Sequence, residues 1–336
     1  MIKENQRIIP FIYKFTLGIL VLIGVFIVAI VFGAADTTAR DVWLAITTDT
    51  ARESASIVHD IRLPREIAAA FVGAALAVSG AIMQGMTRNP LADPGLLGLT
   101  AGANTALAIT IAFIPSANFF GIMVACFIGS AVGAMMVFGI SAMKKGGFSP
   151  FRIVLAGAAI SAFLYAIAEG VGIYFKVSKY VSMWTAGGMA GTSWGQLQII
   201  CPFIIIGILL AMAFSRQLTI LSLNEEIAVG LGQNINQIKT VLFIVIIVLA
   251  GSAVAIVGNL AFIGLIIPHI VRSIVGTDYR FIIPMSAVVG AIFMLVADTL
   301  GRTINAPYET SVIAIVAMIG LPFFLFIVRK GGRAFS

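Results

Sequence analysis

The chain has 336 residues and a formal net charge of +7, with 60% hydrophobic and only 10% charged residues. Because soluble domains carry about 25% charged residues, this composition excludes a soluble protein and indicates one continuous domain, residues 1–336, within membrane lipid. The positive charge does not indicate a nucleic-acid partner, since basic residues also hold the cytoplasmic ends of membrane helices in place.

Long apolar segments predict about ten membrane helices. About 20 apolar residues cross a bilayer, and each crossing should be helical because lipid offers backbone groups no hydrogen-bond partner. Basic residues precede the first helix and follow the last, which favours cytoplasmic termini and an even number of crossings. We expect an all-α polytopic bundle. Its helices are 15–35, 64–86, 95–114, 119–143, 151–174, 197–214, 237–257, 265–275, 281–301 and 310–328.

Arg62-Leu63-Pro64-Arg65 opens the second predicted helix at its outer end. Proline suits the first turn of a helix, and two arginines three residues apart share one helix face. With Arg302, at the outer end of the ninth helix, they predict a basic rim that receives carboxylates. The alternative for each arginine is an ordinary anchor at the membrane interface.

Small residues four apart occur in the third and fourth predicted helices, at Gly98/Gly102 and Gly129/Gly133. Such pairs let helix backbones approach closely. We expect them to serve packing inside the chain rather than a dedicated dimer seam.

A glycine-rich turn with Gly187, Gly188 and Gly191 is predicted between the fifth and sixth helices. The residues around Ser193 also fit the nucleophile-elbow pattern G-x-S-x-G. This pattern is the sole support for a third interpretation, a membrane-embedded hydrolase. That motif needs a strand-to-helix turn and a histidine partner, whereas this segment lies between two membrane helices. We interpret it as a re-entrant turn and expect no catalytic residue.

Residues 222–233 predict a short amphipathic helix on the cytoplasmic side. A capping asparagine begins it, glutamates occupy its first turn, where the helix dipole favours them, and a glycine can end it. Helices that lie on lipid headgroups are usually basic, so we expect a docking helix for a soluble partner. Its predicted docking residues are Leu223, Asn224, Glu225, Glu226, Ile227, Leu231 and Gly232.

Gly258, Gly264 and Pro268 interrupt the apolar segment of the seventh and eighth helices. Non-helical backbone at membrane depth is tolerated only inside protein or along a cavity. We therefore predict that this break, together with Phe262 and the 187–191 turn, lines or gates a transport pathway. No second histidine lies near His269, and we expect neither a metal site nor a cofactor.

Two acids lie in apolar segments, Glu169 and Asp298. Intramembrane acids suggest function, and these two support the alternative, an ion-coupled secondary transporter. Asp298 and Arg302 stand four residues apart, however, so a local ion pair is a sufficient explanation. Glu169 lies near an outer helix end, where it can reach water.

Four segments, in this order, resemble the permease family that imports ferric siderophores, haem and cobalamin, and the match covers nearly the whole chain. They are Arg62–Arg65 running into Gly80–Gln84, Asn89–Gly98, Trp184–Trp194 and Phe262–Arg272.

The resemblance implies a bacterial-type cell-membrane protein of ten helices with three kinds of partner. They are a second permease subunit, two cytoplasmic ATP-binding subunits docked on about Leu223–Gln233, and an extracytoplasmic binding protein whose glutamates meet Arg62, Arg65 and Arg302. The chain contains no Walker A sequence, so we expect ATP hydrolysis on a separate subunit. A ferric siderophore is the expected cargo, because such cargoes are the commonest in the family.

Overall fold

The computed structural model describes residues 2–32, 57–142, 150–186, 188–258, 260–306 and 308–331, and within them every regular element is a helix. The all-α prediction is therefore confirmed for this part of the chain. The elements are α1 (Ile2–Val31), η1 (Ile57–Arg62), α4 (Leu63–Thr87), η2 (Pro94–Leu97), α5 (Leu99–Phe113), α6 (Phe119–Ala142), α7 (Pro150–Tyr174), α8 (Ser178–Ala186), α9 (Trp194–Ala213), α10 (Ser215–Leu223), α11 (Glu225–Gly230), α12 (Ile235–Val257), α13 (Ile263–Val275), α14 (Tyr279–Thr303) and α15 (Val312–Gly331).

Each of the ten predicted membrane helices overlaps a helix of the structure. Seven helical segments of the described residues are long and apolar enough to cross a membrane. The other three, Leu99–Phe113, Ile263–Val275 and Val312–Leu325, are apolar but shorter. A count of ten crossings therefore stays a prediction.

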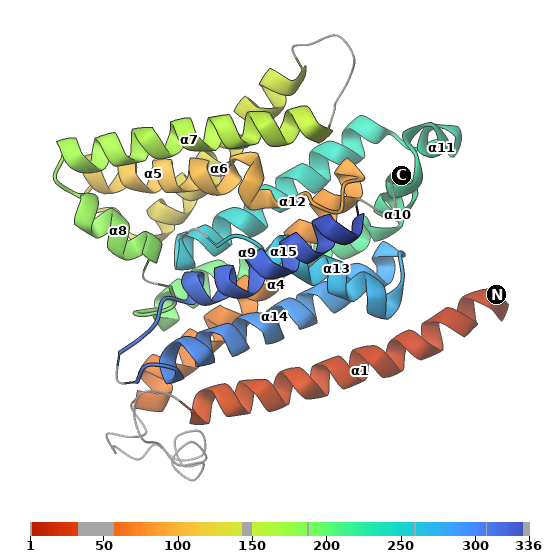
Figure 1. The fold of residues 1–336 in the computed structure, drawn as a ribbon, viewed down its shortest axis with the longest axis horizontal. Coiled ribbons are helices and arrows are strands. Elements are labelled where there is room, and N and C mark those ends of the chain that lie inside the picture. Colours follow the sequence, from red (N-terminus) through yellow and green to blue (C-terminus); the bar gives the residue numbers. More distant parts are fainter. Residues whose placement is uncertain are drawn as a thin grey trace.

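The helices run roughly along one direction and form a bundle (Figure 1). Both ends of the described chain, at α1 and α15, lie at the end of the bundle that carries α10 and α11 (Figure 1). We call this the α11 end. The π-helix η1 and helix α8 lie at the opposite end, which we call the η1 end.

Helix α4 forms the centre of the bundle. It contacts α9, α12, α13 and α14. In the most apolar stretch of Ile57–Thr87, 83% of the residues are buried. Its small residues allow this crowding. A Cβ atom added at Gly80 would lie only 2.0 Å from the carbonyl oxygen of Gly264, so the backbones of α4 and α13 are in direct contact there.

The predicted glycine pairs bring α5 and α6 together, as expected. A Cβ atom added at Gly129 would lie 2.2 Å from the carbonyl oxygen of Gly102, and one at Gly133 would lie 2.2 Å from that of Gly98. No side chain larger than glycine fits at either contact without moving the helices apart. The interpretation as internal packing is confirmed.

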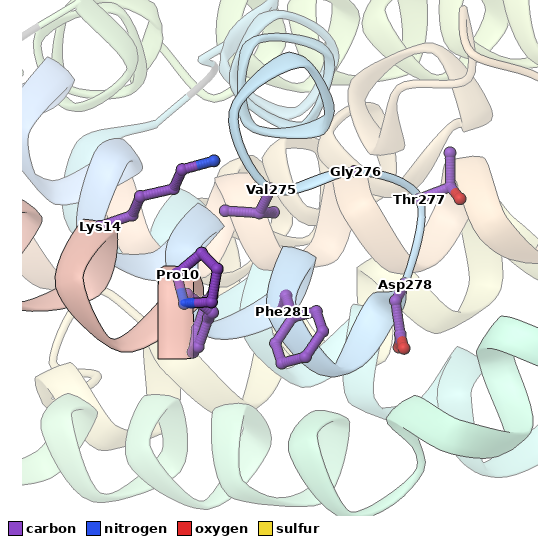
Figure 2. Close-up of a pocket in the computed structure, with 8 residues that line it drawn as sticks. Pro10, Lys14, Val275, Gly276, Thr277, Asp278 and Phe281 are labelled. Atoms are coloured by element: carbon purple, nitrogen blue, oxygen red, sulfur yellow. The ribbon is translucent and has the colours of Figure 1, made fainter. Parts of the chain in front are cut away.

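Helix α1 lies at the edge of the bundle and packs mainly on α14. Only 11% of the residues in its most apolar stretch are buried, which suits a helix that faces lipid. Near the α11 end, Lys14 Nζ donates a hydrogen bond of 2.6 Å to the carbonyl oxygen of Ile274. A cavity of about 320 Å³ lies beside this contact, with Pro10 and Lys14 facing Phe281 and the Val275–Asp278 turn (Figure 2).

Three local expectations differ from the structure. The helix predicted within residues 222–233 is α11, capped by Asn224 as expected, but helix α10, which ends at Leu223 directly before that cap, was not expected. Helix α8 was not expected, since it is short and follows directly on Lys176 and Val177. The predicted helix 95–114 begins with a 3-10 turn, and α5 follows only after Gly98, whose φ is 76°.

We expect Gly129→Val to lower the melting temperature of the detergent-solubilised chain by several degrees, because overpacking a tight contact costs roughly 1–3 kcal/mol. Gly139→Val is the matched control on the same helix, since nothing lies within 4 Å of a Cβ atom at Gly139. Thermal unfolding measures both variants. Equal melting temperatures for the two would contradict the close α5–α6 contact.

Candidate functional site

The first candidate region is a charge cluster at the η1 end, formed by residues of α4, α14, η1 and the loop before α15. We define the charge cluster as Arg62, Arg65, Glu66, Asp298, Arg302 and Glu309.

Arg65 joins two carboxylates on opposite sides of its guanidinium group. Its Nε and Nη2 donate to Asp298 at 3.0–3.1 Å. Its Nη1 and Nη2 donate to Glu309 at 2.7 and 3.1 Å. Such bidentate pairs are among the strongest hydrogen bonds in proteins. The Asp298 side chain is fully buried, whereas that of Glu309 is 42% exposed.

Arg302 continues the cluster toward α1. Its Nε lies 3.0 Å from Asp298 Oδ2, and its Nη2 donates to Glu66. Its guanidinium also donates to the carbonyl oxygens of Ala29 and Phe32 at 3.2 Å. The ion pair of Asp298 with Arg302 that their spacing predicted is therefore confirmed.

Arg62 caps the C-terminal end of α1. Its Nη1 donates to the carbonyl oxygens of Ile30 at 2.7 Å and Val31 at 3.0 Å. The last carbonyl groups of a helix lack intrahelical partners and carry partial negative charge. Arg62 and Arg302 thus satisfy the end of α1 and fasten it to the rest of the bundle.

The three arginines are buried, with exposed fractions of 4% for Arg62, 7% for Arg65 and 3% for Arg302. The sequence interpretation assumed an exposed basic rim, and the structure instead surrounds these side chains with their own chain. That assumption of exposure is wrong for the isolated chain, because three carboxylates and the end of α1 enclose the guanidinium groups. The docking role of the arginines stays a prediction.

Sequence reasoning missed Glu66 and Glu309 as members of the charge cluster. Glu66 follows Arg65 directly, which was a usable signal, but only the tertiary structure brings it to Arg302. Glu309 lies more than 240 positions from Arg65 in the chain. The Arg65 hydrogen bond holds the pKa of Glu309 below its usual range, so this carboxyl is ionised at neutral pH.

The second region is helix α11 with its flanking residues. Asn224 Oδ1 accepts from the Glu226 backbone N–H at 3.0 Å, so the predicted cap is confirmed. Gly232 follows α11 in the left-handed region, with φ of 78°. Glu225 accepts from Lys239 at 2.8 Å and from Arg88 at 3.4 Å, which ties α11 to α12 and to the residue after α4.

Four large apolar side chains on and beside α11 are exposed. The hydrogen bond from Lys239 and the nearby charges hold the pKa of Glu225 below its usual range. Glu226 is exposed. The exposed fractions of the four apolar side chains are 50–68%, and exposed apolar side chains in a group are typical of interaction sites or lipid contact. The four residues are Leu223, Ile227, Val229 and Leu231.

The third region is the break between α12 and α13. Gly258 and Phe262 have φ of 76° and 72°, and a left-handed phenylalanine is rare. Gln84 of α4 donates to the carbonyl oxygens of Gly264 and Leu265 at 3.1 and 3.3 Å. The break is therefore enclosed by protein, as its position in an apolar segment suggested.

Polar contacts behind the break link three helices. Arg272 Nη2 donates to Gln84 Oε1 at 2.6 Å and lies 3.3 Å from the Tyr279 hydroxyl oxygen. Pro268 is buried within α13. The His269 ring packs edge-on against Phe323 at 5.9 Å between centroids, which agrees with a structural role for this histidine.

Helix α15 contacts both the break and the glycine turn. A Cβ atom at Gly320 would lie 2.6 Å from the Phe262 ring, and one at Gly188 would lie 3.6 Å from Val312. Gly188 and Gly191 have positive φ, as a tight turn requires. Gly187 lies outside the described residues. The structure thus places the two predicted pathway elements against one helix.

The nucleophile-elbow pattern has a structural explanation. Ser193 is the N-cap of α9, where its hydroxyl accepts from the Gln196 N–H and the Gln196 side chain accepts from the Ser193 N–H. It follows a glycine turn rather than a strand. Among the described residues, no group of three or more His, Cys, Asp or Glu side chains could hold a metal ion.

Comparisons with known proteins agree with this geometry. Residues 20–330 match the model of the FecCD transport family. The chain is 46% identical over 315 residues to the iron(3+)-hydroxamate import system permease protein FhuB of Bacillus subtilis, covering 94% of this chain and 82% of that protein. It is 38% identical to the hemin transport system permease protein HmuU of Yersinia pestis, covering 89% and 90%.

A solved structure has the same fold. It is an inward-facing conformation of a metal-chelate type ABC transporter, with a TM-score of 0.80 and 25% identity, covering 95% of this chain and 99% of that one. The family resemblance seen in the four sequence segments is confirmed. With its seven candidate spans, the chain is a multi-pass membrane protein, and it belongs to the FecCD transport family.

Proposed function

We propose that this chain is the permease subunit of an ATP-driven importer that moves a ferric chelate across the cell membrane. The observation that carries this proposal is the near full-length similarity to permeases named for iron-hydroxamate and hemin import. The hydroxamate permease shares the higher identity of the two, which favours a ferric hydroxamate siderophore as cargo. We propose no catalytic residue and no cofactor for this chain, because a separate subunit would hydrolyse ATP.

The proposed assembly contains two permease subunits, two ATP-binding subunits at the α11 end and a binding protein at the η1 end. The α11 end is then cytoplasmic. Two observations support this orientation: the basic residues at both ends of the sequence favour the cytoplasm, and both ends of the described chain lie beside α10 and α11 (Figure 1). All ten helices would cross the membrane in this arrangement.

Helix α11 is the proposed contact with the ATPase. Its large apolar residues Ile227 and Val229 are exposed, while Glu225 binds Lys239 of α12. A helix fixed on one side transmits a push or pull to the bundle rather than sliding over it. ATP-driven closure of two ATPase subunits would therefore move α12 and the connected break.

The pathway elements are proposed to be the break and the glycine turn, which both touch α15. Their residues are Gly187, Gly188, Gly191, Gly258, Phe262, Gly264 and Pro268. The cavity beside Lys14 contains none of these residues and lies at the α1 side of the bundle.

The ion-coupled transporter is not favoured. Asp298, its best candidate for proton coupling, is held by both Arg65 and Arg302, and Glu169 is exposed. The relatives are instead permeases of import systems and an ABC transporter.

The proposed function is tested by uptake in a strain that lacks this chain. We expect ATP-dependent uptake of a radiolabelled ferric hydroxamate to be lost and to return with the intact gene, because the permease is the only route through the membrane in such a system. The panel includes a ferric catecholate, haemin and cobalamin. Uptake that survives ATP depletion but collapses with the ion gradient would contradict the proposal.

The ATPase contact is tested by the double variant Ile227→Ser/Val229→Ser. We expect copurification of the ATPase subunit to fall at least about tenfold, since losing roughly 1.4 kcal/mol of apolar burial has that effect. The control is Ile304→Ser, an equally simple change at the η1 end, where the side chain is 63% exposed. If the double variant copurifies as much ATPase subunit as the unchanged protein, α11 is not the ATPase contact.

The charge cluster is tested by Arg65→Met. We expect a loss of roughly 3–5 kcal/mol in unfolding free energy, because Asp298 would keep a buried charge with one partner fewer. The double variant Arg65→Met/Asp298→Leu should recover part of this loss. Arg88→Met is the control, since its pair with Glu225 is about 40% exposed on both sides and such pairs contribute roughly 0–1 kcal/mol. Equal thermal stability of Arg65→Met and Arg88→Met would contradict the cluster.

A further inference from the structure

The two carboxylates bound by Arg65 differ in how firmly the protein holds them. Asp298 is fully buried and also lies 3.0 Å from Arg302 Nε. Glu309 is 42% exposed and sits on the solvent side of Arg65. Exchange of Glu309 for another carboxylate would leave every buried charge of the cluster paired, whereas loss of Asp298 would not.

Glu309 belongs to a short non-helical segment, residues 308–311, between α14 and α15. The Thr310 N–H donates to the carbonyl oxygen of Gly301 at 2.8 Å, so the segment is fastened to the end of α14 at one backbone bond. The Glu309 pair with Arg65 is a second fastening, to α4. Helix α15 begins one residue after this segment, at Val312.

The same helix reaches the pathway elements. Val312 lies against Gly188, and Gly320 lies against the ring of Phe262. A change at Glu309 is thus separated from both the glycine turn and the α12–α13 break by a single helix. Helix α15 therefore connects the Arg65–Glu309 ion pair to the proposed gate.

We propose that Glu309 holds the place of a partner's carboxylate: in the free permease it occupies the solvent side of Arg65, and on docking an acidic side chain of the binding protein replaces it and frees residues 308–311. This inference rests on the proposed function, in which a binding protein docks at the η1 end. It explains how a buried arginine, Arg65, serves a docking partner. Arg65 has a carboxylate on its solvent side both before and after the exchange.

If Glu309 competes with the partner's carboxylate for Arg65, removing the charge of Glu309 should strengthen docking of the binding protein. The test uses the whole permease–ATPase complex in lipid nanodiscs and the purified binding protein of the same import system, with affinity measured by biolayer interferometry at low and high salt. We expect Glu309→Gln to tighten binding at least roughly 2- to 5-fold, the factor that corresponds to an ion pair at the upper end of the range for surface pairs, because only Glu309 is partly exposed. Its melting temperature should fall by less than that of Arg65→Met, because Asp298 keeps both of its arginines.

Asp60→Asn is the matched control. Asp60 is also an exposed carboxylate at the η1 end, with a 60% exposed side chain, but it lies against His59 rather than Arg65. It reports the general effect of removing one negative charge near an acidic partner. Glu309→Gln must exceed it for the proposal to stand.

The possible failures are distinguishable. If the unchanged complex binds the partner in a salt-sensitive way and Glu309→Gln binds no more tightly than Asp60→Asn, the exchange is overturned while docking at this end survives. If the unchanged complex shows no binding, or binding insensitive to salt, electrostatic docking itself fails and the exchange fails with it.

Discussion

The ion pairs of Arg65 and Arg302 with Asp298 join parts of the chain that are far apart in the sequence, and the η1 end of the bundle depends on them. Arg65 begins α4, Asp298 and Arg302 end α14, and Arg302 also binds the carbonyl groups that end α1. Buried charges are costly unless they are paired. Each arginine therefore has a carboxylate or a helix end within reach, and the cluster fixes three helices and one loop in a single arrangement.

At the other end of α4 the helices are joined by backbone contact and amide bonds rather than by charge. Gly80 lets α13 approach α4, and Gln84 binds two carbonyl groups just after the break. The first turn of α13 is thus bonded to α4 directly after the break. Helix α4 thus connects the paired charge cluster at one end of the bundle to the α12–α13 break.

Much of the fold was predictable because it depends on local patterns. Apolar length placed all ten helices, glycine spacing placed the α5–α6 contact, and spacing of four residues placed the Asp298–Arg302 pair. The burial of the arginines was not predictable, because their enclosing partners Glu66 and Glu309 are brought to them only by the packing of α4, α14 and α15. Sequence position alone made them look like an exposed rim. Helix α10, which begins directly after the end of α9, was also missed.

The most direct test of this account is a pair of experimental structures of the complete transporter in lipid, one free and one with its binding protein bound. The account predicts that Arg65 keeps Asp298 in both, and that its other partner changes from Glu309, now at 2.7 Å, to a carboxylate of the binding protein. Residues 308–311 should shift with that exchange. A bound structure in which Glu309 still holds Arg65, with the partner's acids elsewhere, would contradict the account.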